Sequence, residues 1–170
     1  MGREVRMVPA DWQHPKDGGR YKPLLSGSFE ERLQEWETGK EKWNEGLRAD
    51  WNGGWKELSA DEKAMSYEDW DGFKPACEDY MPAFEDGEAT HFMMYENTTE
   101  GTPISPAFAT PEELARWLAD SGASAFAGQT ATYEAWLSTC KSGSAPSAMF
   151  SPQTGLVSGV EGINKPNESA

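Results

Sequence analysis

Cysteine and histidine are scarce in this sequence, and long apolar runs are absent. Two cysteines, Cys77 and Cys140, and two histidines, His14 and His91, occur in 170 residues. They form no CxxC pair and no spacing typical of zinc ligands, so we expect no metal and no cofactor. No stretch approaches the roughly 18 apolar residues of a membrane-spanning helix, and no apolar signal region opens the chain. We therefore expect a cytosolic protein in a reducing compartment, without membrane contact.

The usual catalytic signatures are also missing. The sequence has no GxSxG, GxGxxG, GxxxxGK[ST] or HExxH motif, so we assign no catalytic residue. The run Asp69-Trp70-Asp71-Gly72 begins like a calcium loop, but Phe73 stands where the third oxygen ligand belongs. Cys140 falls on the apolar stripe of an expected helix, which favours inert packing over a nucleophile's role. An enzyme of a known type is therefore disfavoured.

What the chain has in excess is negative charge, with a net charge of −14. Residues 26–100 carry seven basic and twenty acidic side chains, and between positions 68 and 100 Lys74 is the only basic residue. Such a surface repels phosphates, which disfavours direct nucleic-acid binding and favours a partner protein with a basic surface. Simple solubility is the alternative explanation. The oligomeric state does not follow from the sequence.

Aromatic residues supply most of the large apolar surface, with 8 Trp, 7 Phe and 5 Tyr. We expect a single acidic domain over residues 1–163 and a frayed tail over 164–170. Trp36, Trp43, Trp117 and Trp136 have the spacing of helical core positions. Trp51, Trp55 and Trp70 fall in expected turns, where packing on the core is favoured and an exposed groove is the alternative.

Capping signals and periodicity predict three helices. Ser28 and Glu31 form a capping box that opens a helix running to about Ala49, with a possible bend at Gly39 and Gly46. Thr110, followed by Pro at the first helical position, opens a second helix that stops at Gly122. A third helix is expected from about Ala131 to Cys140.

Alternating and apolar segments predict strands at 3–8, 90–96, 102–105 and 155–161. The fold class is therefore α+β: a small, mostly antiparallel sheet packed against about three helices, with long irregular acidic connections. Trp70, Phe73, Tyr80 and Phe84 are expected to hold the acidic connection in place.

An exposed aromatic residue among carboxylates is typical of protein-binding surfaces. We expect the carboxylates of residues 61–100, together with those of the first helix, to form a contiguous exposed band that lysine and arginine do not interrupt. The candidate partner-binding residues are Glu68, Asp69, Trp70, Asp71, Glu78, Asp79, Glu85 and Asp86.

Several phrases of the sequence carry a resemblance: VPADWQHP near the start, YEDWDG and DYMP in the middle, and MYENTTEGTPISPAFATPEELARWLADSGASAFAGQTATYEAWL toward the end. Together they resemble a group of small uncharacterised proteins of tailed bacteriophages, over most of the chain. The resemblance implies a phage or prophage source and the cytoplasm of a bacterial host. It implies no activity and no functional residues.

Three hypotheses for function follow. The first is a protein that binds a host protein and inhibits or redirects it, during host takeover or counter-defence, with nucleic-acid mimicry as one form. The second is a virion or assembly component, which would copurify with particles. The third is an enzyme of an unfamiliar type, which a deep pocket with converging polar groups would support.

Overall fold

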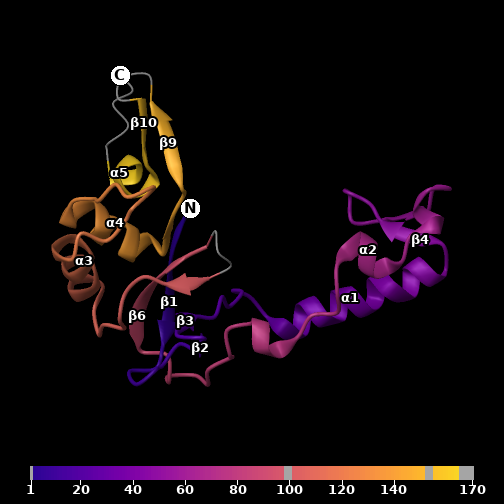
Figure 1. The fold of residues 1–170 in the computed structure, drawn as a ribbon, viewed down its shortest axis with the longest axis horizontal. Coiled ribbons are helices and arrows are strands. Elements are labelled where there is room, and N and C mark those ends of the chain that lie inside the picture. Colours follow the sequence, from indigo (N-terminus) through magenta and orange to yellow (C-terminus); the bar gives the residue numbers. More distant parts are fainter. Residues whose placement is uncertain (1, 98–100, 152–154, 165–170) are drawn as a thin grey trace. The chain divides into compact units, whose positions relative to one another are not determined.

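The computed structural model describes residues 2–97, 101–151 and 155–164 (Figure 1). Within the chain, two compact units are distinguished. The outer unit consists of residues 1–25 and 83–170, and the inner unit of residues 26–82. The single domain expected for 1–163 thus contains an inner unit inserted between two parts of an outer one. Each unit is described separately below.

The outer unit is built on a four-stranded antiparallel sheet with the order β7-β6-β1-β8. β1 (Arg3–Val8) and β6 (His91–Glu96) pair along their full lengths, so that Val5 lies opposite Met94. β7 (Thr102–Pro103) and β8 (Ser144–Ala145) each add two residues at the edges. The strands expected at 3–8, 90–96 and 102–105 are confirmed in this sheet, the third over a shorter stretch.

Two capped helices cover the core of the outer unit. α3 (Pro111–Asp120) begins with a capping box in which Thr110 and Glu113 exchange hydrogen bonds, and α4 (Tyr133–Ser142) is capped by Thr132. Both predicted helices are confirmed. Trp136 is fully buried between them and the sheet, in a cluster whose other buried members are Met94, Leu114, Ala115, Leu118, Ala125, Ala135, Cys140, Ala145 and Val160.

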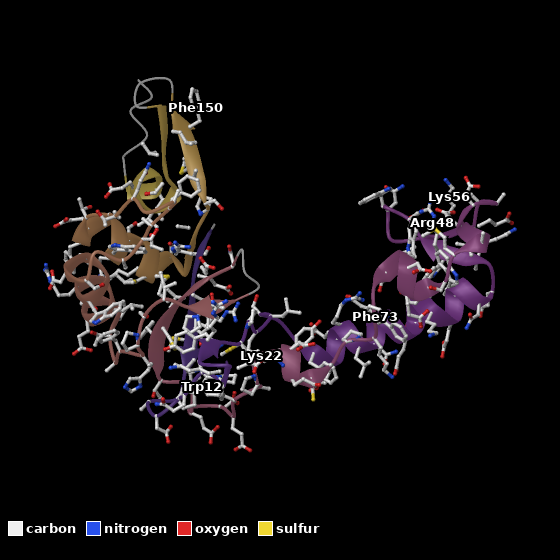
Figure 2. All side chains as sticks on the ribbon, viewed as in Figure 1. Trp12, Lys22, Arg48, Lys56, Phe73 and Phe150 are labelled. Atoms are coloured by element: carbon white, nitrogen blue, oxygen red, sulfur yellow. The ribbon has the colours of Figure 1, made fainter. Side chains whose placement is uncertain are left out.

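The C-terminal part of the outer unit differs from expectation. β10 (Gly155–Ser158) pairs with β9 (Ala148–Ser151) in a separate hairpin, not with the main sheet, and the chain then forms α5 (Gly159–Asn164). The strand expected at 155–161 is therefore wrong in its partner and in its last three residues. Phe150 projects from β9 and is 75% exposed (Figure 2). Of the tail expected to fray, positions 165–170 lie outside the described residues.

The inner unit begins with the longest helix, α1 (Phe29–Asn44), whose N-cap Ser28 accepts a hydrogen bond from the Glu31 amide. The helix ends five residues before the expected Ala49, because Gly46 adopts a φ of +85° and turns the chain into a strand. β4 (Leu47–Ala49) and β5 (Trp55–Glu57) then form a hairpin around the expected turn. The first helix therefore belongs to the inner unit.

A short helix that was not expected completes the inner unit. α2 (Tyr67–Asp71) opens with a capping box in which Ser66 and Asp69 exchange hydrogen bonds. In the sequence, α2 is preceded by a 3₁₀ turn at Glu62–Ala64 and followed by another at Cys77–Asp79. The buried apolar residues of this unit are Trp36, Trp43, Leu58 and Tyr67.

The remaining elements are short. β2 (Lys16–Asp17) and β3 (Arg20–Tyr21) form a small hairpin. Over the described part of the chain, no helix has both the length and the apolar character that crossing a bilayer requires. The architecture as a whole is α+β, as the sequence predicts.

Candidate functional site

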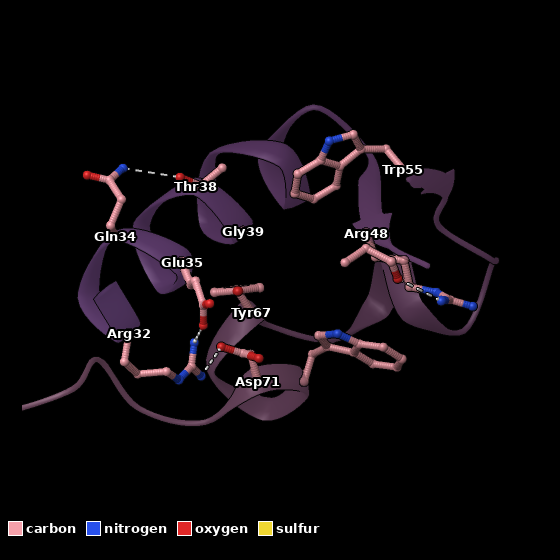
Figure 3. A pocket seen from close by; sticks show the side chains of 11 residues that line it. Arg32, Gln34, Glu35, Thr38, Gly39, Arg48, Trp55, Tyr67 and Asp71 are labelled. Atoms are coloured by element: carbon pink, nitrogen blue, oxygen red, sulfur yellow. Dashed lines mark hydrogen bonds and ion pairs between the residues drawn. The ribbon is translucent and has the colours of Figure 1, made fainter. Parts of the chain in front are cut away.

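The inner unit carries a groove of about 410 Å³ that we call the tryptophan groove (Figure 3). α1 and α2 form two of its walls, and the β4–β5 hairpin forms the third. Its lining residues are Arg32, Gln34, Glu35, Thr38, Gly39, Arg48, Ala49, Trp55, Tyr67, Trp70 and Asp71.

Two half-exposed indoles and one arginine give the groove its character. Trp55 and Trp70 are each 44% exposed. Trp70 packs on the buried ring of Trp43, and the guanidinium carbon of Arg48 lies 5.2 Å from the centre of the Trp70 ring. Arg48 Nε lies 2.7 Å from Glu62 Oε1, so the guanidinium is held in place against the indole. The result is a rigid aromatic surface that remains open to a partner.

The floor of the groove depends on the absence of a side chain at Gly39. The Tyr67 hydroxyl packs against α1 at this position, and a Cβ on residue 39 would overlap it. The Tyr67 ring lies 5.4 Å from the Trp36 ring and 5.8 Å from the Trp43 ring, centre to centre. Burial, together with the neighbouring Asp71 carboxylate, raises the pKa of Tyr67 to about 12. Tyr67 therefore stays neutral at physiological pH.

Ion pairs between α1 and α2 hold the wall opposite the hairpin. Arg32 Nη2 lies 2.6 Å from Asp71 Oδ2, and its Nη1 lies 4.0 Å from Glu35 Oε2 (Figure 3). The hydrogen bond to Asp71 raises the pKa of Arg32. Lys40 pairs with Glu68, and this contact lowers the pKa of the Glu68 carboxyl. The two helices are thus joined by paired charges.

The residues predicted as a binding surface are divided between two units. Glu68, Asp69, Trp70 and Asp71 lie on α2, and of these only Trp70 and Asp71 line the groove. Asp69 is committed to capping, since the hydrogen bond from Ser66 lowers its pKa. Glu78 and Asp79 are exposed on the 3₁₀ turn of the inner unit, whereas Glu85 and Asp86 are exposed in the outer unit.

The expectation of a band that no cation interrupts does not hold in the inner unit. Glu68 and Asp71 are ion-paired, and Lys74 Nζ lies 2.7 Å from Glu37 Oε1. The physical reason is helical packing: α1 contributes cations on the side that faces α2, which the spacing along either segment alone does not reveal. The carboxylates around α2 therefore serve first to hold the two helices together.

Sequence reasoning did not identify Arg48 and Tyr67 as groove residues. For Trp51, Trp55 and Trp70 it favoured packing on the core over an exposed groove. Trp51 is fully exposed and does not line the groove, while Trp55 and Trp70 do. Phe73, expected to help hold the acidic connection in place, is 88% exposed. The signal that was available was the run WNGGW, because its glycines form the tight turn that presents Trp55.

Two further residues that were considered for a chemical role, Cys140 and His91, have contacts typical of structural residues. Cys140 is buried in the core, and burial raises the pKa of its thiol to about 12, which keeps it protonated and unreactive at neutral pH. The neighbouring Lys141 pairs with Glu112 at 2.9 Å. His91 opens β6, and its Nδ1 lies 3.0 Å from the Thr90 hydroxyl.

His14, in the outer unit, belongs to a buried polar network. Its Nε2 lies 2.6 Å from the Lys22 carbonyl oxygen, which can only accept, so Nε2 carries a proton. His14 Nδ1 lies 3.2 Å from the Tyr95 hydroxyl oxygen, which accepts from Trp12 Nε1 at 3.3 Å and lies 3.4 Å from the Met93 sulfur. Burial lowers the pKa of His14, and the nearby Arg6 guanidinium acts in the same direction. The network therefore suits a neutral imidazole.

This network predicts a pH dependence of stability. The unfolded chain takes up a proton at His14 near pH 6.5 whereas the folded chain does so only at a lower pH, so the free energy of unfolding should fall as pH drops below about 6.5. Urea unfolding between about pH 7.5 and about pH 5 measures this slope. His14→Gln should flatten this slope. An unchanged slope in His14→Gln would contradict the assignment.

Comparison with protein-family models, with curated proteins and with solved structures yields no match to this chain.

Proposed function

We propose that this chain acts by binding another protein and that the tryptophan groove is the contact surface. The observation that supports this most directly is the pair of half-exposed indoles, Trp55 and Trp70, in one groove with Arg48. Tryptophan and arginine are the residue types most enriched among those that dominate binding energy at protein interfaces. Indoles that are already fixed by packing lose little conformational entropy when a partner covers them.

The charge of the inner unit favours a partner with a basic surface. Residues 26–82 carry seven basic and fifteen acidic side chains, a net charge of −8. Ion pairing between α1 and α2 leaves this net charge unchanged, so long-range attraction to a basic partner persists. Electrostatic attraction then speeds the encounter, and the indoles supply the short-range contact.

Nucleic-acid mimicry receives less support than an interface anchored by aromatic side chains. Mimicry needs regularly spaced carboxylates whose charge is not compensated at close range. Glu68 and Asp71, two of the candidate carboxylates, are instead bound to Lys40 and Arg32. We therefore propose recognition through the groove, with the surplus negative charge in a supporting role.

The resemblance to bacteriophage proteins suggests where the partner is found. On that basis we propose a protein of the bacterial host, met in the host cytoplasm, which this chain inhibits or redirects. The aromatic groove supports binding, and the consequence for the partner is an inference from the resemblance alone.

The proposal is tested by capture from bacterial lysate with the immobilised full-length chain and two matched variants. Trp55→Ala removes a groove indole that has no ring neighbour among the described residues, so its loss leaves the small core of the inner unit intact. Trp51→Ala removes a fully exposed indole outside the groove. We expect Trp55→Ala to weaken capture of a discrete partner at least about tenfold, and Trp51→Ala to leave it unchanged.

Salt separates the two contributions to binding. Raising the ionic strength should slow association of the wild-type chain, because it screens the net charge of the inner unit. Residual binding at high salt should still depend on Trp55. Equal capture by all three chains, or equal losses in both variants, would reject the groove as the binding surface.

A further inference from the structure

The outer unit contains a second cavity, of about 570 Å³, whose lining shares no residue with the groove described above. One wall is the segment from Ala10 to Tyr21, and the other is the segment Pro103 to Ala107, with Trp117 of α3 beside it. The volume falls within the roughly 300–1,000 Å³ typical of sites for small molecules. We call it the Lys16 cavity.

The first wall of the Lys16 cavity is rigid and aromatic. The rings of Trp12 and Tyr21 stand edge-on to His14, at 6.3 and 5.6 Å between centres. His14 itself is held by the Lys22 carbonyl and the Tyr95 hydroxyl. Because the polar atoms of Trp12 and His14 are already paired within the protein, this aromatic part of the wall keeps its shape whether or not a ligand is present.

On the opposite wall, the Ser105 hydroxyl also has its hydrogen bonds made within the protein. The Ser105 hydroxyl accepts from the Met94 amide at 2.9 Å and donates to the Pro106 carbonyl at 2.8 Å. Ser105 and His14 are both engaged, whereas the Tyr21 hydroxyl, the Trp117 indole N–H and two more polar side chains of the lining can meet a polar ligand group, and the proposal rests on these last two. They are the carboxamide of Gln13 and the ammonium of Lys16, both exposed.

Charge distinguishes this cavity from two other hollows of the described residues. The tryptophan groove includes Glu35 and Asp71, and a shallow hollow on α3 includes Glu112, Glu113 and Asp120. The Lys16 cavity has no carboxylate in its lining, although the chain has 29 acidic residues. Lys16 Nζ lies 4.7 Å from the centre of the Tyr21 ring, and no carboxylate of the described residues lies within ion-pair distance of it.

We propose that the Lys16 cavity binds a small planar anion, an aromatic ring that bears a carboxylate. The ring lies against the faces of Trp12 and Tyr21, the carboxylate accepts from the Lys16 ammonium, and Gln13 donates a second hydrogen bond. This site is independent of the proposed protein partner, since it lies in the other unit and uses none of the groove residues.

The test uses 2-naphthoate as the probe and its neutral amide, 2-naphthamide, as the matched control. Amide chemical shifts of the full-length chain are followed by NMR as each compound is added. We expect 2-naphthoate to shift the signals of residues around His14, Lys16 and Ser105 in a saturable way. The amide should bind about fivefold more weakly, the size expected for a charge-assisted contact at a partly exposed site.

Two variants of the same small hairpin decide whether Lys16 carries the preference. Lys16→Gln should abolish the difference between the acid and the amide. Arg20→Gln removes the same charge from the same hairpin but from a residue that does not line the cavity, and it should preserve the difference. Equal binding of the two compounds to the wild-type chain, no saturable shift with either, or an equal effect of both variants would overturn the proposal.

Discussion

Replacing Trp136 with alanine is expected to lower the free energy of unfolding of the outer unit by about 3–5 kcal/mol. The side chain is fully buried between α3, α4 and the sheet, where it contacts the largest apolar cluster of the chain. Alanine leaves a cavity that the surrounding helices can close only in part. Urea unfolding followed by hydrogen exchange of outer-unit amides measures the loss without relying on tryptophan fluorescence.

Trp136→Phe is the control that separates packing from hydrogen bonding. The indole N–H of Trp136 is buried and has no hydrogen-bond partner in the described part of the chain. Phenylalanine removes this unpaired donor, which offsets part of the packing that it also removes. The phenylalanine variant should therefore lose less than half of what the alanine variant loses. A loss below about 1 kcal/mol in Trp136→Ala would contradict the role assigned to this residue.

The second large effect is expected at Gly39, where two physical arguments give opposite signs. Alanine in the middle of a helix is favoured over glycine by about 1 kcal/mol, so helix propensity alone predicts stabilisation. In the structure, however, a Cβ at position 39 would overlap the Tyr67 hydroxyl and lie 2.9 Å from the Tyr67 Cζ. The Tyr67 ring cannot move away easily, since it is packed against Trp36 and Trp43. We expect Gly39→Ala to destabilise the inner unit by about 2–3 kcal/mol.

A double variant tests whether the Tyr67 hydroxyl is the cause. Tyr67→Phe removes the atom that the new methyl group meets, so Gly39→Ala should cost much less in the Tyr67→Phe background than alone. Urea unfolding of the wild type, the two single variants and the double variant gives the interaction energy directly. Strictly additive effects, or stabilisation by Gly39→Ala alone, would show that the clash is relieved in another way.

Features of the fold that depend on local sequence were predicted well. The caps at Ser28, Thr110 and Glu113 form from residues within one helical turn, and each was visible as a short pattern. The alternation in residues 3–8 identified a strand, but burial in β1 does not follow it, since Arg6 is buried and Met7 is 39% exposed. The Ser66–Asp69 box is equally local, but the helix that follows spans only Tyr67–Asp71 and has too few residues to show a period.

Features that depend on contacts between distant segments were predicted poorly. Nothing in the two residues of β8 indicates a strand, since they pair only because β1 lies beside them. The partner of β10 is β9, a neighbour in sequence, and the alternation in residues 155–158 says nothing about that choice. The groove was missed for the same reason, because Arg48, Trp55 and Trp70 come from three elements that meet only after folding.

The insertion of residues 26–82 between β1 and its partners affects the order in which the chain is made and folded. All contacts of the inner unit are available once residue 82 has left the ribosome, whereas β1 must wait for β6 and, finally, for β8 at residues 144–145. At about 5–20 residues per second, several seconds of synthesis separate these events. A nascent chain with a finished inner module and an unpaired first strand is then the expected intermediate, and its open strand edge is the part that chaperones would need to shield.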